Sequence, residues 1–329
     1  MTITVYISQD TTAVAVGAER VATAFVQAAL NAELNYTLVR NGSRGAFGLE
    51  PLIEIEMGAQ GRLAFGPVSV ADVPSLVTAI TDGGYERHSN YLGPVSTIPW
   101  LENQTRITFK RCGEGAPTDL ANYRALGGYR GLEHALTLSP QAIVDEIKVS
   151  GLRGRGGAAF PTGIKWQTVL DAQGEQKYIV CNADEGDSGT FADRLLMEAD
   201  PYQLIEGMTI SGLAVGATKG FIYLRSEYPR AQKMLERAID VAMAEGYLGA
   251  DLCGSGQRFE LEVRMGAGSY ICGEETALLN SLEGKRGVVR AKPPLPAIEG
   301  LFGKPTVVNN VLTLASVSSI LADGGAEYA

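Results

Sequence analysis

The segment SGLRGRGGAAFPTGIKW, residues 150–166, is the most unusual stretch of this sequence. It holds five glycines, two arginines and a lysine, with Phe160 and Trp166 among them. Glycines let backbone N–H groups approach a phosphate closely, because no Cβ intervenes and a positive φ costs little. A helical pattern begins at Gly163, so the loop also brings a helix N-terminus toward an anion. The pattern predicts a phosphate-binding loop, and a tight surface turn with solvated arginines is the alternative.

Acidic turns follow two predicted strands further along the chain. A strand at 177–180 runs into CNADEGDSGT, residues 181–190, and a strand at 260–265 runs into GAGSYICGEE, residues 266–275. Carboxylates placed after strands lie at the ligand-binding edge of a parallel sheet, where they accept ribose hydroxyls and repel a 2′-phosphate. This favours NAD over NADP. Each acidic pair also fits a simple helix N-terminus, which attracts negative charge.

The glycines at 266 and 268 resemble the start of the G-x-G-x-x-G fingerprint. The pattern fails at its last glycine, where Ile271 stands. The sequence therefore does not predict an ordinary Rossmann dinucleotide site.

Composition restricts the classes of function. The length of 329 residues is enough for two domains. The net charge of −9 argues against a nucleic-acid-binding protein, which usually has a basic surface. Its four cysteines form no C-x-x-C pair, and its two histidines lie far apart, so a metal site, a disulfide framework and a Ser-His-Asp triad are not predicted. We expect the cysteines to be small buried or half-buried residues. No apolar run reaches about 18 residues and no secretory signal opens the chain, so we expect no membrane span and a cytoplasmic location.

The element pattern divides the chain into two α/β domains. Residues 1–82 follow the order βαβββα and predict a small thioredoxin-like domain, although no redox cysteine pair is present. Residues 83–116 are rich in Gly, Ser, Asn and Pro and predict a linker. Residues 117–329 predict the second domain, with helices expected at 140–149, 201–215 and 229–244 and a strand at 220–224.

Four motifs in the second domain together resemble a known family. They occupy residues 151–166, 181–190, 266–276 and 304–311, the last reading KPTVVNNV. In this order they resemble the NADH-binding flavoprotein subunit of respiratory complex I, and the diaphorase subunits of soluble NAD-linked hydrogenases and formate dehydrogenases. The resemblance implies a non-Rossmann α/β domain in which FMN lies deep and NADH stacks on its ring.

The resemblance also implies roles for particular residues. Those expected around FMN are Gly154, Arg155, Gly156, Lys165, Asn182, Asp184, Gly273, Glu274, Asn309, Asn310 and Thr313. Those expected around NADH are Phe160, which would stack on the adenine, and Glu185, Tyr270 and Glu275. Glu185 and Lys165 are the residues expected to act in catalysis. The family pattern often has a second aromatic directly after the Lys-Trp pair, where this sequence has Gln167-Thr168, so we expect a one-sided clamp on the adenine. Leu312 replaces a glutamate of the pattern.

The N-terminal domain resembles the thioredoxin-like [2Fe–2S] subunit that partners this flavoprotein. Its turn GAFGLEP, residues 45–51, aligns so that the cluster cysteines fall at Ser8, Ala13, Ser43 and Phe47. Because none of these is a thiolate ligand, we expect a clusterless docking module. The fusion of such a domain to the flavoprotein, with the run RNGSRG at 40–45, most resembles the β subunit of molybdenum- or tungsten-dependent, NAD-linked formate dehydrogenases.

That resemblance implies partners and cofactors. The partners would be a [2Fe–2S] thioredoxin-like γ subunit and an α subunit with molybdenum or tungsten and iron–sulfur clusters, with no nucleic acid and no membrane. The cofactors would be FMN and NAD. The family also has a small ubiquitin-like domain and a helical domain, and its [4Fe–4S] cluster is expected in the helical domain, outside these residues. A hydrogenase or complex I diaphorase, and a non-catalytic assembly module, remain alternatives.

Overall fold

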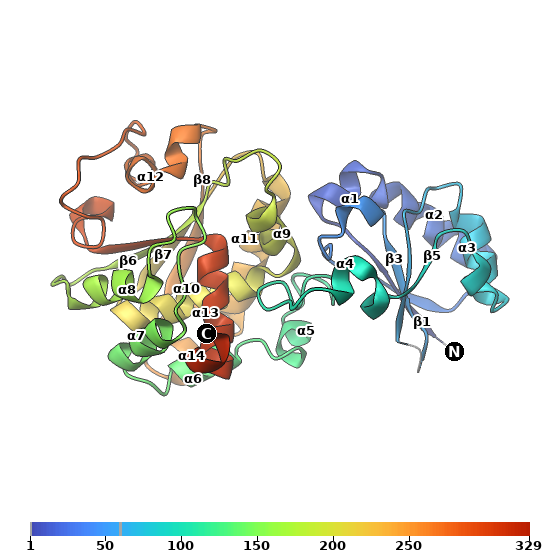
Figure 1. The fold of residues 1–329 in the computed structure, drawn as a ribbon, viewed down its shortest axis with the longest axis horizontal. Helices are drawn as coiled ribbons and strands as arrows, with labels where there is room; N and C mark the ends of the chain where they lie inside the picture. The colour runs from blue at the N-terminus through green and yellow to red at the C-terminus, as the bar shows by residue number, and fades with distance from the viewer. Residues whose placement is uncertain (1, 59–60) are drawn as a thin grey trace. The chain divides into compact units, whose positions relative to one another are not determined.

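The chain forms two compact units in the computed structural model, which describes residues 2–58 and 61–329. Unit 1 comprises Met1–Asp119 and unit 2 comprises Leu120–Ala329. Each unit has a sheet of its own (Figure 1).

The described residues of unit 1 form a five-stranded mixed sheet in the order β2-β1-β3-β4-β5. The strands are β1 (Ile3–Ile7), β2 (Tyr36–Val39), β3 (Ile53–Glu56), β4 (Arg62–Phe65) and β5 (Tyr91–Pro94). Strand β1 runs parallel to β2 and antiparallel to β3, and β4 is antiparallel to both β3 and β5. The order βαβββα predicted for residues 1–82 is confirmed, with the short helix α1 (Thr11–Ala15) as an addition to it.

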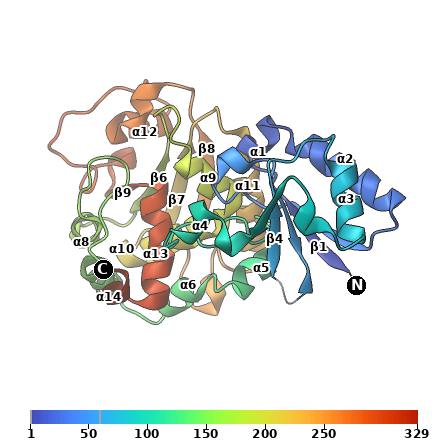
Figure 2. The same cartoon turned by 45° about the vertical axis from the view of Figure 1, so that its right-hand side comes forward.

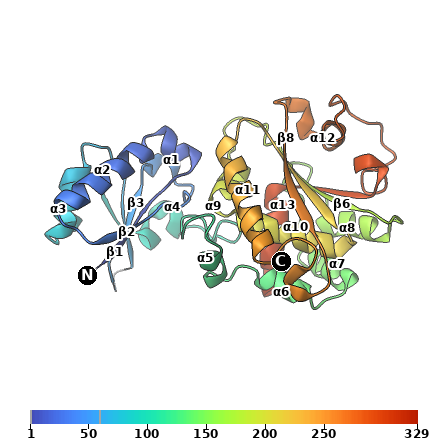
Figure 3. The same cartoon turned by 180° about the vertical axis from the view of Figure 1, so that it is seen from behind.

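Helices α2 (Ala18–Asn31) and α3 (Val73–Thr81) cover one face of this sheet (Figure 3). Side chains alternate between the two faces of a strand, so every second residue of β1 and β3 points toward these helices. The resulting core joins the apolar residues of both strands to the inner sides of the helices, among them Val5, Ile55, Phe25 and Leu76. A short helix, α1 (Thr11–Ala15), precedes α2.

The segment predicted as a linker, residues 83–116, contributes to unit 1. Strand β5 completes the sheet, and the short helices η4 (Val95–Thr97) and α4 (Pro99–Glu102) follow it. Val95, Ile98 and Leu101 pack with Leu52 and Ala64. The few apolar residues of segment 83–116 therefore form a second small core in unit 1. The Gly- and Pro-rich composition of the segment gave no indication of this core.

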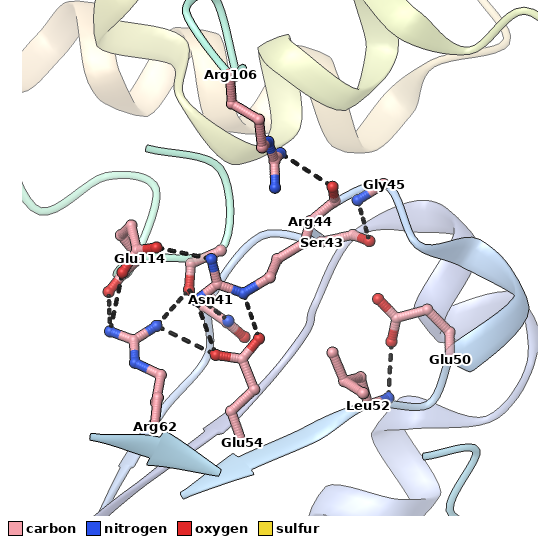
Figure 4. Close-up of polar contacts among 11 residues, drawn as sticks. Asn41, Ser43, Arg44, Gly45, Glu50, Leu52, Glu54, Arg62, Arg106 and Glu114 are labelled. Carbon is pink, nitrogen blue, oxygen red and sulfur yellow. Dashed lines mark hydrogen bonds and ion pairs between the residues drawn. The ribbon is translucent and has the colours of Figure 1, made fainter. Parts of the chain in front are cut away.

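An ion-pair network ties the end of this segment to the sheet of unit 1 (Figure 4). The Arg44 guanidinium donates to both carboxylate oxygens of Glu54, at 2.6 and 2.9 Å, and to Glu114 at 2.6 Å. Arg62 pairs with Glu54 at 3.2 Å and donates to the Gly113 carbonyl at 2.8 Å. Because the Arg44 and Glu54 side chains are buried, removing either partner alone would leave an uncompensated buried charge.

The described residues of unit 2 form a fully parallel four-stranded sheet in the order β8-β7-β6-β9. The strands are β6 (Tyr178–Ala183), β7 (Lys219–Leu224), β8 (Glu260–Met265) and β9 (Thr306–Asn310). The predicted strands at 177–180, 220–224 and 260–265 are confirmed, and so is a mixed α/β architecture.

Helices enclose the sheet of unit 2 on both faces, as a parallel sheet requires. Helices α10 (Pro201–Val215), α11 (Pro229–Ala244) and α13 (Val311–Asp323) contact one face, and Figure 2 shows α13 along β6 and β9. Helix α12 (Glu275–Leu282) packs with Val180, Tyr223 and Val308 on the other. The remaining helices are α5 (Leu120–Ala125), α6 (Arg130–Ala135), α7 (Pro140–Val149), α8 (Thr162–Asp171), α9 (Ala192–Ala199) and α14 (Gly325–Tyr328).

Helices α10 and α13 are buried along most of their length and approach each other closely. Gly207 of α10 lies against the Leu314 carbonyl of α13, and a Cβ at this position would collide with that oxygen. Gly131 of α6 lies in the same way against the Ser318 carbonyl. Glycine is required here by close approach of backbones and not by an unusual φ.

The expectation that the cysteines are buried or half-buried is confirmed for three of them and is wrong for Cys253. Cys112 in unit 1 and Cys181 and Cys272 in unit 2 are buried. Cys253, in the short helix η5 (Leu252–Gly254), is exposed.

Candidate cofactor site

A cavity of about 480 Å³ lies in unit 2 at the carboxyl ends of β6 and β9. These strands are neighbours in the sheet, with Asn182 opposite Asn310, so the acidic turn after β6 and the Asn309-Asn310 pair meet at one edge. The glycine-rich loop, the N-terminus of α12 and the segment 292–297 form the other walls. The volume is in the range of cofactor pockets.

Most of the residues predicted to hold a cofactor line this cavity. They are Gly154, Gly156, Phe160, Lys165, Asn182, Gly273, Glu274, Glu275, Asn309 and Asn310. Among the described residues, the predicted members Arg155, Asp184, Glu185, Tyr270 and Thr313 do not line it.

The glycine-rich loop is held in shape by backbone hydrogen bonds at its ends. The Gly154 N–H donates to the Phe160 carbonyl at 2.9 Å, and the Arg155 N–H donates to the Thr313 hydroxyl at 2.8 Å. Thr313 is fully buried, so it supports the loop from behind and leaves the cavity wall to Gly154.

The middle of the same loop leaves backbone donors without acceptors. Among the described residues, none accepts from the N–H groups of Gly156, Gly157 or Ala158. Gly157 has a φ of +107°, and a Cβ on Gly156 would lie 3.3 Å from the Cβ of Asn310. Unsatisfied N–H groups beside a cavity are the donors that a phosphate requires. The loop therefore fits the phosphate group of a nucleotide.

A chain of alternating charges crosses the cavity wall. The Lys165 ammonium donates to the Val308 carbonyl at 2.8 Å and lies 3.7 Å from the Glu275 carboxylate. Glu275 pairs with Lys292 at 2.6 Å, and Lys292 also pairs with Glu274 at 3.2 Å. Burial lowers the pKa of Lys165, although Glu275 opposes the shift. Sequence reasoning missed Lys292, for which the only signal was the run KPP at 292–294.

Glu274 has both of the roles weighed from the sequence. Its carboxylate accepts from the N–H groups of Thr276 and Ala277 at 2.8 and 3.0 Å and so caps α12, and it also lines the cavity. Burial alone would raise the pKa of this carboxyl, but the hydrogen bonds from Thr276, Ala277 and Lys292 outweigh burial and lower it. The cap keeps a negative charge at the cavity.

Asparagine side chains fix the floor of the site. The Asn182 amide donates to the Gly273 carbonyl at 2.8 Å, which joins β6 to the loop before α12. The Asn309 carbonyl accepts from the Trp166 indole at 3.0 Å, which joins β9 to α8. Asn182 therefore connects the sheet to a loop that lines the cavity, and Asn309 connects it to helix α8, whose residues Lys165 and Thr168 line the cavity.

Glu185 lies elsewhere than the sequence led us to expect. Its carboxylate is buried and accepts from the N–H groups of Asp193 and Arg194 at 3.0 and 3.2 Å, and from the Tyr228 hydroxyl at 3.0 Å. The N-terminus of α9 satisfies a carboxylate better than an open cavity does, because its backbone donors have no other partners. Glu185 thus does not line the cavity, and its role beside the nicotinamide nucleotide stays a prediction.

The other predicted residues outside the wall have separate surroundings. Burial raises the pKa of Asp184 to about 6, with Arg225 opposing the shift. Tyr270 is 73% exposed and its hydroxyl donates to Asp187 at 3.2 Å. The Arg155 guanidinium donates to the Tyr328 hydroxyl at 3.3 Å.

An apolar side of the cavity is available for a flat ring. Phe160 lines it with half of its side chain exposed, and Thr168, Leu295 and Pro296 lie on the same cavity. Aromatic faces stack well on nucleotide bases, whereas threonine offers no ring. A base bound here would therefore have one aromatic platform.

Two kinds of feature are not found in the part of the chain that the structure describes. No group of three or more His, Cys, Asp or Glu side chains is placed to hold a metal ion. No helix within residues 2–58 and 61–329 has the length and apolar character needed to cross a bilayer.

The amino-acid sequence is similar to subunits of hydrogenases and of NADH-quinone oxidoreductases. Over 223 residues the chain is 52% identical to the NADP-reducing hydrogenase subunit HndC of Solidesulfovibrio fructosivorans, covering 68% of this chain and 45% of that protein. Over 229 residues it is 49% identical to an NADH-quinone oxidoreductase subunit of Aquifex aeolicus, covering 70% and 54%. The chain spans about half the length of the curated relatives it matches.

A solved structure and a family model complete the comparison. The crystal structure of an NAD⁺-reducing [NiFe]-hydrogenase in the H₂-reduced state is similar with a TM-score of 0.57 and 30% identity, covering 99% of this chain and 53% of that one. Residues 147–319 match the family model described as the Nuo51 FMN-binding domain.

Proposed function

Because the chain belongs to the family of the Nuo51 FMN-binding domain, we propose that unit 2 is a diaphorase module that binds FMN and exchanges electrons with NAD⁺ or NADH. The observation that carries the proposal is the cavity wall. Unsatisfied N–H groups of a glycine-rich loop, a lysine and an asparagine pair converge there on one space at the edge of a parallel sheet.

The residues present divide the proposed binding task between them. The loop N–H groups of Gly156 and Ala158, which line the cavity, would hold the FMN phosphate, with Lys165 supplying positive charge. Amide groups of Asn182 and Asn310 would meet the polar edges of the flavin. Thr313, which is buried behind the glycine-rich loop, would keep that loop in place, and Asp184, in the turn after β6, is still expected near the flavin.

The chemistry that a bound flavin supplies is hydride exchange with a nicotinamide and single-electron exchange with iron–sulfur clusters. The protein's own contribution is positioning and electrostatics. Lys165 would stabilise negative charge that develops nearby. Phe160 would stack on the adenine, and Glu275 would accept hydrogen bonds from ribose hydroxyls. Glu185 is held at the N-terminus of α9, and its predicted contact with the nicotinamide nucleotide would require its carboxylate to exchange those donors for the ligand.

A direct test is to measure FMN binding and NADH-dependent ferricyanide reduction by the purified protein. Replacing Lys165 by Ala removes a cation that burial has already partly desolvated, so we expect FMN affinity to fall about tenfold, or about 1.4 kcal/mol. Lys233→Ala, on the exposed side of α11, is the matched control and should bind like the parent. Equal affinity of both variants would contradict the assignment of Lys165.

We further propose that unit 1 is a degenerate thioredoxin-like domain that docks partner subunits. Its support is the strand order β2-β1-β3-β4 with α2 and α3 on one face, and the position of Ser8, Ala13, Ser43 and Phe47 where the resemblance expects cluster ligands. This fusion supports an assignment as the β subunit of an NAD-linked formate dehydrogenase with α and γ partners.

A hydrogenase partner is the second candidate. One observation favours it, namely that the NAD⁺-reducing [NiFe]-hydrogenase structure covers 99% of this chain, unit 1 included. Purification of the native complex, followed by metal analysis, separates the two. Molybdenum or tungsten in the complex would support the formate dehydrogenase, and nickel would support the hydrogenase.

A further inference from the structure

The side chain of Asn310 is held at both ends of its amide. Its carbonyl oxygen accepts from the Leu312 N–H at 2.9 Å and so caps α13, and its Nδ2 donates to Asp193 Oδ2 at 2.7 Å. Asn310 lines the cavity. Since Nδ2 carries two hydrogens, one remains for a ligand. The direction in which Asn310 presents that hydrogen depends on Asp193.

Asp193 is a carboxyl group buried behind the cavity wall. It lies in the first turn of α9, and 4% of the residue is exposed. The titratable groups that face it are Glu185, from the turn after β6, and the buried Cys181 thiol of β6. The guanidinium of Arg194, on its own helix, packs instead over the rings of Phe191 and Tyr228.

The carboxylate of Glu185, next to Asp193, accepts most of the hydrogen bonds that nearby groups donate. Glu185 accepts the N–H groups of Asp193 and Arg194 and the Tyr228 hydroxyl, whereas the donor to the Asp193 side chain is the Asn310 amide. Among the described residues, three hydrogen-bond donors therefore stabilise a negative charge on Glu185, and one donor does so for Asp193. Burial, followed by the proximity of Glu185, raises the pKa of Asp193 to about 8.

We propose that Asp193 is a positioning residue of the cofactor cavity, which orients the Asn310 amide and whose ionisation weakens binding of a phosphorylated flavin. This inference rests on the proposed function of unit 2. The neutral carboxyl accepts from Asn310 without adding charge. Its ionisation places a second buried negative charge beside Glu185 and one hydrogen bond from the cavity, where it opposes an anionic ligand.

The test measures FMN affinity by quenching of flavin fluorescence between pH 6.5 and 9.5. For the parent protein we expect the dissociation constant to rise about fivefold as the pH passes about 8. Asp193→Asn keeps an acceptor for Asn310 but cannot ionise, so its affinity at pH 7 should match the parent and stay level with pH. Asp193→Ala lacks the acceptor and should bind about tenfold more weakly at pH 7. Asp240→Asn, an exposed position on α11, is the matched control.

A double-mutant cycle tests whether Asp193 acts through Asn310. Asn310→Ser keeps a side-chain oxygen to cap α13 but removes the amide that reaches Asp193. In this background Asp193→Ala should cause no further loss of affinity, because the interaction it removes is already absent. If Asp193→Ala does not fold, the other two single variants still test the proposal. The pH dependence of FMN affinity must vanish in Asp193→Asn and persist in Asn310→Ser.

Each remaining outcome overturns a defined part of the proposal. A parent-like pH dependence in Asp193→Asn, or additive losses in the cycle, would overturn the role of Asp193 while leaving the flavin site in place. No FMN binding by the parent protein at any pH would overturn the proposed function itself, and this inference with it.

Discussion

Glu50 in unit 1 is a buried carboxyl group surrounded by neutral and acidic neighbours. It is 6% exposed, and its carboxylate accepts from the Leu52 N–H at 2.9 Å (Figure 4). Burial raises its pKa to about 7, and the carboxylates of Asp10 and Glu54 add to the shift, while hydrogen bonds from Leu52 and Ser43 oppose it. The folded protein therefore binds a proton here that the unfolded chain releases at lower pH.

Replacing Glu50 by Gln should make unit 1 more stable at high pH. The pKa is about 7 in the folded state against an ordinary 4.5, so the contribution of Glu50 is intact below pH 4.5 and is lost as the pH rises through 7. At pH 8 the variant should gain on the order of 2 kcal/mol over the parent, and at pH 4.5 little. Thermal unfolding at both pH values measures this. Glu86→Gln, at an exposed position, is the control, and an equal gain at both pH values would contradict the prediction.

Glu275 should set the preference between the two nicotinamide dinucleotides. Its carboxylate lines the cavity beside Lys292 and would repel a 2′-phosphate. Replacing it by Gln removes the repulsion and leaves Lys292 paired with Glu274 alone, so the ratio of kcat/KM for NAD⁺ over NADP⁺ should fall about tenfold. Steady-state kinetics with both dinucleotides test this. Glu262→Gln on β8 should leave the ratio unchanged.

At the scale of elements, the packing of α10 on α13 depends on the absence of a side chain at Gly207. An alanine there would meet the Leu314 carbonyl, which belongs to a buried helix and has little room to shift. We expect Gly207→Ala to destabilise unit 2 by about 1–3 kcal/mol, despite the better helix propensity of alanine. Chemical denaturation followed by circular dichroism measures this. Gly84→Ala has no atom within 4 Å of its new Cβ and should be nearly neutral.

The sequence predicted those helices whose periodicity and capping residues lie within the helix itself. The helices expected at 201–215 and 229–244 are α10 and α11, each with a proline in its first turn. The pattern failed at 83–116, because β5 gains its partner β4 only in three dimensions. A short segment of mixed composition carries no periodicity that would reveal such pairing.

The candidate site could be predicted in part for the same reason. The glycine-rich loop and the Asn309-Asn310 pair have unusual compositions and line the cavity as expected. The position of Glu185 could not be predicted, because the competing site for its carboxylate is the N-terminus of α9, several residues further on. Asp193 gave no signal at all, since its importance arises from a contact with Asn310, 117 positions away.

At the scale of the molecule, the cavity is built entirely from unit 2. Its lining residues run from Gly154 to Asn310, and the helices and strands behind them have their own core. We therefore expect residues 120–329, expressed alone, to fold and to bind FMN within about threefold of the affinity of the whole chain. Fluorescence titration of both proteins is the measurement. A folded fragment without affinity would show that unit 1 contributes to the site.

The distribution of thiols gives the molecule a set of internal reporters. Cys253 is accessible in the native state, whereas Cys112 in unit 1 and Cys181 and Cys272 in unit 2 are buried. A thiol reagent applied under native conditions should modify Cys253 at once and the others only through opening of the structure. Mass spectrometry of the labelled peptides would then time the opening of each unit from a single sample, and cofactor bound at the cavity should slow the labelling of Cys181 and Cys272 but not that of Cys112.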